Sequence, residues 1–160
     1  MKRVLWLVCL LALSAVAAGS LPAQSNPFVG TWKLNLAKSK FEGVPTPKSL
    51  NRTVVADAAG ATYTFSGTDA DGNPIEYSFS SKFDGKDSAV TGSGMPGGAD
   101  TVAMTRVNSN MVRTILKKGG TAIGVSNTEV SKDGRVTTVK GSGVDAEGKK
   151  FSMVSVYDEQ

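Results

Sequence analysis

Short turn signals recur along the chain every 8 to 14 residues and separate runs that are rich in β-forming side chains. Gly, Asn and Asp tolerate the positive φ angles of tight hairpins, and Val, Thr, Tyr and Phe favour strands. No window after residue 25 shows a sustained helical period. The spacing predicts ten strands, near residues 28–36, 49–57, 61–67, 74–82, 87–91, 100–108, 110–118, 121–131, 135–143 and 150–157.

The hydrophobic pattern of these runs has the two-residue period of a sheet with one buried face. On the fourth expected strand Ile75, Tyr77 and Phe79 alternate with Glu76 and Ser78. Alternation through consecutive hairpins is typical of an antiparallel meander. Ten such strands leave long exposed edges unless the sheet closes on itself. The chain is therefore expected to be all-β, an antiparallel up-and-down β-barrel of 8–10 strands. A β-sandwich is the competing architecture.

The N-terminus has the layout of a secretory signal peptide. Lys2 and Arg3 precede an apolar run over residues 4–18, and Ala23-Gln24-Ser25 is a small-x-small cleavage site. A membrane anchor is the competing interpretation, but about 15 apolar residues are short for a bilayer, which needs roughly 20. The sequence predicts a signal peptide over residues 1–25 and one domain over residues 26–160, located outside the cytoplasm as a secreted or periplasmic protein with no membrane span after cleavage.

Residues 26–160 contain no His and no Cys. The sequence has no His, and its single Cys, Cys9, lies in the predicted signal peptide. This composition excludes a thiol nucleophile, a Ser-His or Cys-His pair and an imidazole or thiolate metal site. Most carboxylates fall in expected turns, where their bonds to the backbone explain them. We therefore expect no enzyme activity, no catalytic residue, no metal and no cofactor.

The charge pattern does not favour a nucleic-acid partner. Removing Lys2 and Arg3 leaves 16 basic and 14 acidic residues. These charges are dispersed, whereas nucleic-acid binding needs a basic stripe with interleaved aromatic residues. The oligomeric state is not predicted by the sequence.

Two segments, residues 67–73 and 143–149, match each other at fixed offsets, and each precedes an alternating run. The acidic pattern Asp69-x-Asp71 has two interpretations, a calcium loop and a hairpin turn. A calcium loop of the EF-hand type would need greater length and a bidentate Glu downstream. The hairpin turn is therefore favoured.

The two ends of the domain carry a resemblance to known barrels. Residues 26–34, Asn-Pro-Phe-Val-Gly-Thr-Trp-Lys-Leu, resemble the opening strand of the fatty-acid-binding proteins, and Gly30-x-Trp32 resembles the lipocalin signature. The closing residues 154–160, Val-Ser-Val-Tyr-Asp-Glu-Gln, resemble the last strand of the same fold. The chain is thus similar to the calycin superfamily, and to small exported bacterial lipocalin-like proteins that pair Gly-Thr-Trp-Lys-Leu-Asn with a final Val-Tyr.

The chain also departs from that resemblance. The family has two helices between its first two strands, whereas residues 37–48 are short and contain Pro45 and Pro47, which predicts a barrel without a helical lid. The family's two ligand-binding arginines align with Ser155 and Glu129, and only Tyr157 is retained. Because burying an unpaired carboxylate costs several kcal/mol, the resemblance implies a ligand that is small, apolar and uncharged.

The expected function is that of an exported lipocalin-like protein which binds such a ligand inside the barrel. The alternative is a ligand-free barrel that acts through surface contacts with an envelope or secreted partner. Arg52, Arg106 and Arg113 could each replace the missing cations, but we favour the interpretation that one of them stacks on Trp32 at the barrel base. The candidate ligand-binding residues are Trp32, Tyr63, Phe65, Tyr77, Phe79, Met104, Arg106, Arg113, Met153 and Tyr157.

Overall fold

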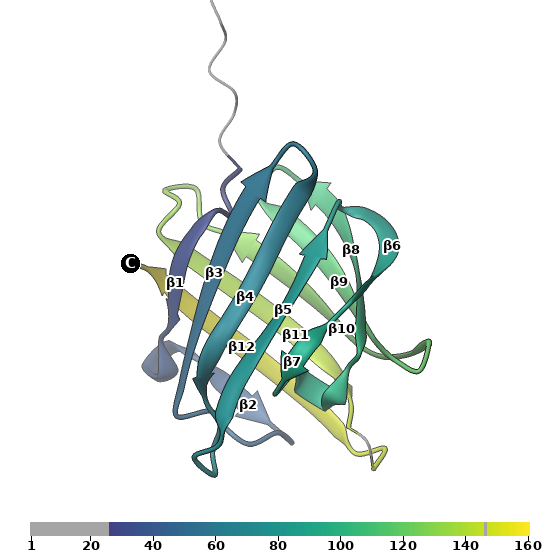
Figure 1. The fold of residues 1–160 in the computed structure, drawn as a ribbon. Helices are drawn as coiled ribbons and strands as arrows, with labels where there is room; N and C mark the ends of the chain where they lie inside the picture. The colour runs from purple at the N-terminus through teal and green to yellow at the C-terminus, as the bar shows by residue number, and fades with distance from the viewer. Residues whose placement is uncertain (1–25, 146) are drawn as a thin grey trace, which may run out of the picture.

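The computed structural model describes residues 26–145 and 147–160, which form twelve strands and two 3-10 turns (Figure 1). The predicted signal peptide lies outside the described residues. The strands are β1 (Gly30–Leu34), β2 (Lys40–Glu42), β3 (Ser49–Asp57), β4 (Gly60–Thr68), β5 (Pro74–Ser81), β6 (Asp84–Ala89), β7 (Thr91–Ser93), β8 (Thr101–Asn108), β9 (Met111–Lys118), β10 (Thr121–Val130), β11 (Val136–Val144) and β12 (Lys150–Glu159). The 3-10 turns are η1 (Leu36–Lys38) and η2 (Pro96–Gly98).

All strands belong to one antiparallel sheet that curls into a nearly closed barrel (Figure 1). The order is β6-β8-β9-β10-β11-β12-β1-β3-β4-β5-β7, with β2 added beside β12. β1 connects the N-terminal and C-terminal strands of the sheet, because it pairs with β3 on one side and with β12 on the other. The expected up-and-down barrel is confirmed, and the single continuous sheet is not a sandwich.

The strand predictions hold, with one addition and one division. The expected strand at residues 87–91 is divided at Val90 into β6, which pairs with β8, and β7, which pairs with β5. This division brings the two ends of the sheet together. The addition, β2, lies between the first two expected strands, where no strand was predicted, and pairs with residues 152–154 of β12. The described part of the segment between β1 and β3 holds no α-helix, as expected for a barrel without a helical lid.

The expected alternation is present on β5, where Ile75, Tyr77 and Phe79 are buried and Glu76 is exposed. On β1 the prediction extends too far. Trp32 and Leu34 are buried, but Leu36 is 43% exposed because the strand ends at Leu34 and η1 begins. The polar side chain at the N-cap of η1, Asn35, accepts a bond from Lys38 N and so favours this ending.

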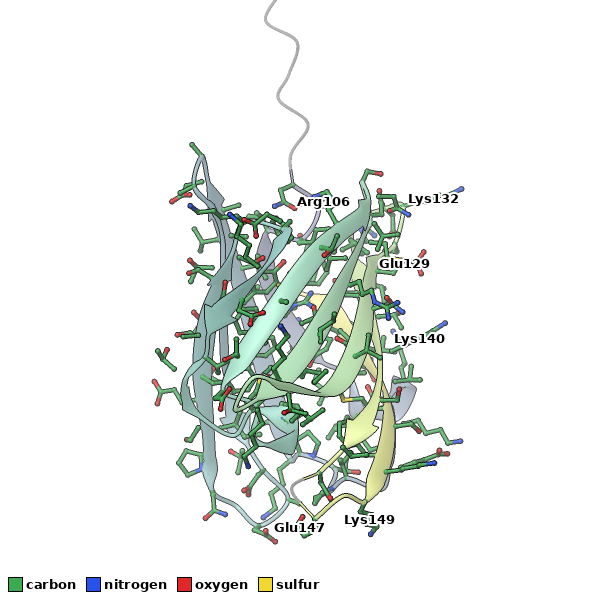
Figure 2. All side chains as sticks on the ribbon, turned by 90° about the vertical axis from the view of Figure 1, so that its right-hand side faces the viewer. Arg106, Glu129, Lys132, Lys140, Glu147 and Lys149 are labelled. Atoms are coloured by element: carbon green, nitrogen blue, oxygen red, sulfur yellow. The ribbon has the colours of Figure 1, made fainter. Side chains whose placement is uncertain are left out.

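The barrel has one end filled by side chains. Phe28 is fully buried there, and the indole Nε1 of Trp32 donates to its carbonyl oxygen at 3.1 Å. The guanidinium of Arg106 lies over the rings of Phe28 and Phe83, at 5.4 and 4.6 Å from their centroids. Figure 2 shows Arg106 at this end and Glu147 at the opposite end of the barrel.

The two matching acidic segments form equivalent hairpin turns at that opposite end. The carboxylate of Asp69 accepts bonds from the backbone amides of Asp71, Gly72 and Asn73. The carboxylate of Asp145 accepts in the same way from the amides of residues 147 and 149. These bonds confirm the hairpin interpretation of both segments.

Candidate functional site: the barrel interior

A cavity of about 360 Å³ occupies the barrel interior. Residues 44, 45 and 47, the β4–β5 turn at residues 69–71 and the loop at residues 94–97 line its mouth, at the end away from Phe28. Small-molecule sites in proteins commonly measure about 300–1,000 Å³. The cavity is therefore large enough for one small ligand.

One wall of the cavity consists of stacked aromatic pairs. Tyr63 on β4 and Phe79 on β5 are direct cross-strand partners, and their ring centroids lie 5.1 Å apart at 17°. Phe65 and Tyr77 form the second pair, 4.5 Å apart at 15°. Aromatic cross-strand pairs of this kind stabilise a sheet, and here they also present ring surface to the cavity.

The opposite strands contribute small hydroxyl groups to the same cavity. Thr114 on β9, Ser126 and Thr128 on β10 and Ser155 on β12 are all buried, and all four line the cavity. Side chains alternate between the two faces of a strand, and these four residues fall on the inner face. Thr114 and Ser126, for example, are cross-strand partners and therefore lie on the same face. The interior therefore has an aromatic wall and a wall of hydrogen-bonding groups.

A buried cation, Arg52, lies between these walls. Its relative exposure is 2%, and it is the cross-strand partner of Trp32 on β1 and of Phe65 on β4. Its guanidinium carbon lies 5.3 Å from the Trp32 ring centroid and 5.1 Å from that of Tyr157. Burial lowers the pKa of Arg52, but arginine stays protonated in proteins.

The nitrogens Nε and Nη2 of Arg52 have no hydrogen-bond partner among the described residues. The same holds for the hydroxyl of Tyr63. Orphaned buried polar atoms are rare in native structures, and an unpaired charge is the costliest kind. Both residues line the cavity, so a molecule held there, either a ligand or an ordered water, would supply the missing partners.

All three tyrosines of the chain line the cavity, and burial keeps them protonated. Burial raises the pKa of Tyr63 to about 12, although the Arg52 and Arg106 charges act in the other direction. Burial also raises the pKa of Tyr77 and of Tyr157 above the ordinary value of 10.0. The three phenols are therefore hydrogen-bonding groups without charge at neutral pH.

Seven of the ten candidate residues line the cavity, namely Tyr63, Phe65, Tyr77, Phe79, Met104, Met153 and Tyr157. Trp32 is fully buried beneath Arg52 and does not line it. The inward orientation considered for Arg113 is corrected by the structure, whereas Arg106 lies on the inner face of β8 opposite the buried Val112 but does not line the cavity. Arg106 lies over Phe28 and Phe83 at the filled end, and Arg113 is exposed on the outer face of β9. A ligand-binding role for any of these residues stays a prediction.

The favoured interpretation of the arginines is confirmed for Arg52, which stacks on Trp32. The sequence carried a signal for its orientation, because Leu50 and Val54 flank Arg52 at two-residue spacing on one strand face. The alignment of Glu129 with a ligand-binding position is wrong. Glu129 is exposed and points away from the barrel (Figure 2), whereas Thr128 lines the cavity.

The described residues contain no group of three or more His, Cys, Asp or Glu side chains that could hold a metal ion. No helix in that part of the chain is long and apolar enough to cross a membrane.

No protein-family profile matches the sequence, and no curated protein matches it. Several solved structures match the fold. The ileal bile acid-binding protein of zebrafish, complexed with cholic acid, is 14% identical with a TM-score of 0.50, and the match covers 84% of this chain and 99% of that chain. This likeness shows that the chain shares the fold of that protein, in agreement with the barrel expected from the sequence.

Two further matches have lower TM-scores. A redesigned β-barrel, mFAP1, bound to DFHBI, is 11% identical with a TM-score of 0.43, covering 83% of this chain and 95% of that chain. The siderocalin Ex-FABP is 9% identical with a TM-score of 0.37, covering 84% of this chain and 74% of that chain.

Proposed function

We propose that this chain is an exported barrel protein that binds a small, mostly apolar molecule in its interior. The observation that supports the proposal best is the cavity of about 360 Å³ with its stacked aromatic wall. Export rests on the sequence of residues 1–25. The proposed activity is binding without chemistry, since residues 26–160 hold no His and no Cys.

The cavity chemistry supports such a ligand in two ways. Transfer of each methylene from water into the cavity contributes about 0.8 kcal/mol, and the rings of Tyr63, Phe65, Tyr77 and Phe79 offer flat surface for stacking. The hydroxyls on β9, β10 and β12 offer hydrogen bonds to oxygen or nitrogen atoms of the ligand. The zebrafish protein with the same fold was solved in complex with cholic acid.

Fluorescence titration with N-phenyl-1-naphthylamine, a neutral dye that brightens in apolar surroundings, tests this function. The exported protein should bind one dye molecule per chain at micromolar concentration, and native mass spectrometry of the same preparation should show any ligand that co-purifies. Absence of binding up to about millimolar dye, which corresponds to about −4 kcal/mol, would reject the proposal. The surface-interaction alternative would then take its place.

A further inference from the structure

The starting observation is the unpaired charge of Arg52 inside the barrel. The ion pairs in the described part of the chain join exposed or half-exposed side chains, and none includes Arg52. Buried charges in proteins are normally paired, since taking an ion out of water is costly. The ring faces of Trp32 and Tyr157 offset part of this cost through cation–π attraction. They leave the hydrogen-bonding edge of the guanidinium unsatisfied.

The unsatisfied edge has a defined geometry. Nε and Nη2 lie on the same side of the guanidinium, so their N–H groups form the fork that holds two oxygens of one carboxylate. Because aromatic rings lie against Arg52 from β1 and from β12, the plane of the fork is held in place. A preorganised fork of this kind recognises an acid by shape as well as by charge.

The neighbouring groups suit the same acid. The hydroxyl of Tyr63 has no partner, and Ser155 and Tyr157 line the same cavity. Burial raises the pKa of Tyr63 to about 12, so its phenol keeps its proton and can donate.

Two acidic residues of the described chain line the cavity, Asp69 and Asp71; both lie in the β4–β5 turn at its mouth, and neither forms an ion pair with Arg52. The carboxylate of Asp69 already accepts from three backbone amides and from the side chain of Asn73. These bonds hold Asp69 in the hairpin turn. The counter-charge is therefore best supplied from outside the chain.

We propose that the ligand carries a carboxylate, which accepts hydrogen bonds from Nε and Nη2 of Arg52 and from the hydroxyl of Tyr63. This inference rests on the proposed function and reverses the sequence-based expectation of an uncharged ligand. The cation comes from β3, not from the positions at Ser155 and Glu129 that the family resemblance singled out.

A competition experiment on the unmodified protein tests the inference directly. Decanoate and decanol, which share the same chain length and differ in the headgroup, are titrated against bound N-phenyl-1-naphthylamine. Decanoate should displace the dye at a concentration lower by about tenfold or more, as expected for charge-assisted bonds to a buried fork. Equal displacement, or better displacement by decanol, would overturn the inference.

Variants assign the effect to Arg52. A second dye, 8-anilinonaphthalene-1-sulfonate, adds an anionic group to the same aromatic scaffold. Arg52→Met should lower the affinity for this anionic dye, relative to the affinity for the neutral dye, by about tenfold or more. Arg52→Lys should retain only part of the anionic preference, because an ammonium lacks the fork. The matched control is Arg135→Met, which removes an exposed arginine in the β10–β11 turn and should change neither dye.

The outcomes separate this inference from the proposed function. If the neutral dye does not bind the unmodified protein, the proposed function fails and the inference fails with it. If the neutral dye binds but the anionic preference is absent or survives in Arg52→Met, only the inference fails. If Arg52→Met does not fold, the decanoate and decanol comparison decides, since it needs no variant.

Discussion

The guanidinium of Arg52 lies against the indole of Trp32, with 5.3 Å between the guanidinium carbon and the ring centroid, and the two residues are direct cross-strand partners. Trp32 therefore connects two regions of the barrel. Through Nε1 it bonds to Phe28 at the filled end, and through its ring it supports the cation beside the cavity. A change at Trp32 should affect stability first and ligand binding second.

Replacing Trp32 with Ala should lower the free energy of unfolding by roughly 3–5 kcal/mol, as for other large-to-small core changes. The side chain is fully buried, and its removal leaves both a cavity and the Phe28 carbonyl without its donor. Urea denaturation of the ligand-free protein measures the loss. Val55→Ala is the control, because Val55 is 63% exposed and its truncation should cost less than about 0.5 kcal/mol. A loss below 1 kcal/mol for Trp32→Ala would contradict its place in the core.

Much of the barrel could be predicted because strands such as β5 carry their apolar side chains on one face only. On β5 every second residue is apolar and the intervening residues are polar, so the inner face is unambiguous. The hairpins were equally predictable, since Asp and Gly at fixed offsets form the turns at residues 69–73 and 145–149. β2 was not predictable, because Lys40-Phe41-Glu42 becomes a strand only through its pairing with β12.

The orientation of the arginines shows where pattern alone fails. On β9 the outer face carries Met111, Arg113 and Ile115, and the inner face carries Val112 and Thr114. Both faces hold apolar residues, so the sequence does not distinguish inside from outside. Pairing with β8 and β10 makes that choice, and it places Arg113 outside. Arg52 is the converse case, a charge on an inner face. Leu50 and Val54 indicate that face in the sequence, and pairing with Trp32 and Phe65 establishes it in the structure.

The three buried tyrosines predict the alkaline behaviour of the protein. The pKa of Tyr63 in the folded state is about 12 against an ordinary value of 10.0, so the folded state holds its proton more tightly than the unfolded state. Stability should therefore be undiminished below pH of about 10 and should fall as the pH rises from about 10 towards 12. Near-ultraviolet absorbance measures tyrosinate, and circular dichroism measures unfolding in the same titration. No tyrosinate should form until the protein unfolds. If one tyrosine ionised near pH 10 while the protein stayed folded, the result would contradict burial of that phenol.

Closure of the barrel depends on a glycine. Gly92 in β7 has φ of +94° and pairs with Tyr77, and a Cβ there would collide with the carbonyl oxygen of Glu76. Gly148 has φ of +79°, but a Cβ there would meet nothing. Substitution by Ala costs about 1–2 kcal/mol at either position for the left-handed backbone alone. Gly92→Ala should lose at least about 1 kcal/mol more in urea denaturation, since β7 must separate from β5.

Export should leave a defined N-terminus on the mature protein. The small residues Ala23 and Ser25 follow an apolar segment of signal-peptide length. N-terminal sequencing of the exported protein should begin between Ser20 and Asn26. Recovery of the full-length chain in a membrane fraction would instead support the membrane-anchor interpretation.

Blocking the cavity should abolish binding without unfolding the barrel. Ser126 on β10 lines the cavity, so a phenylalanine in its place extends into the space that the ligand would occupy. Ser126→Phe should weaken binding of N-phenyl-1-naphthylamine by at least about tenfold, which corresponds to about 1.4 kcal/mol. The neighbouring Asn127 is exposed on the outer face of the same strand, so Asn127→Phe adds the same ring outside the barrel and should leave the affinity unchanged. Both variants should keep a cooperative urea transition. If they bind the dye equally well, the dye lies on the surface, and the interior is not the binding site.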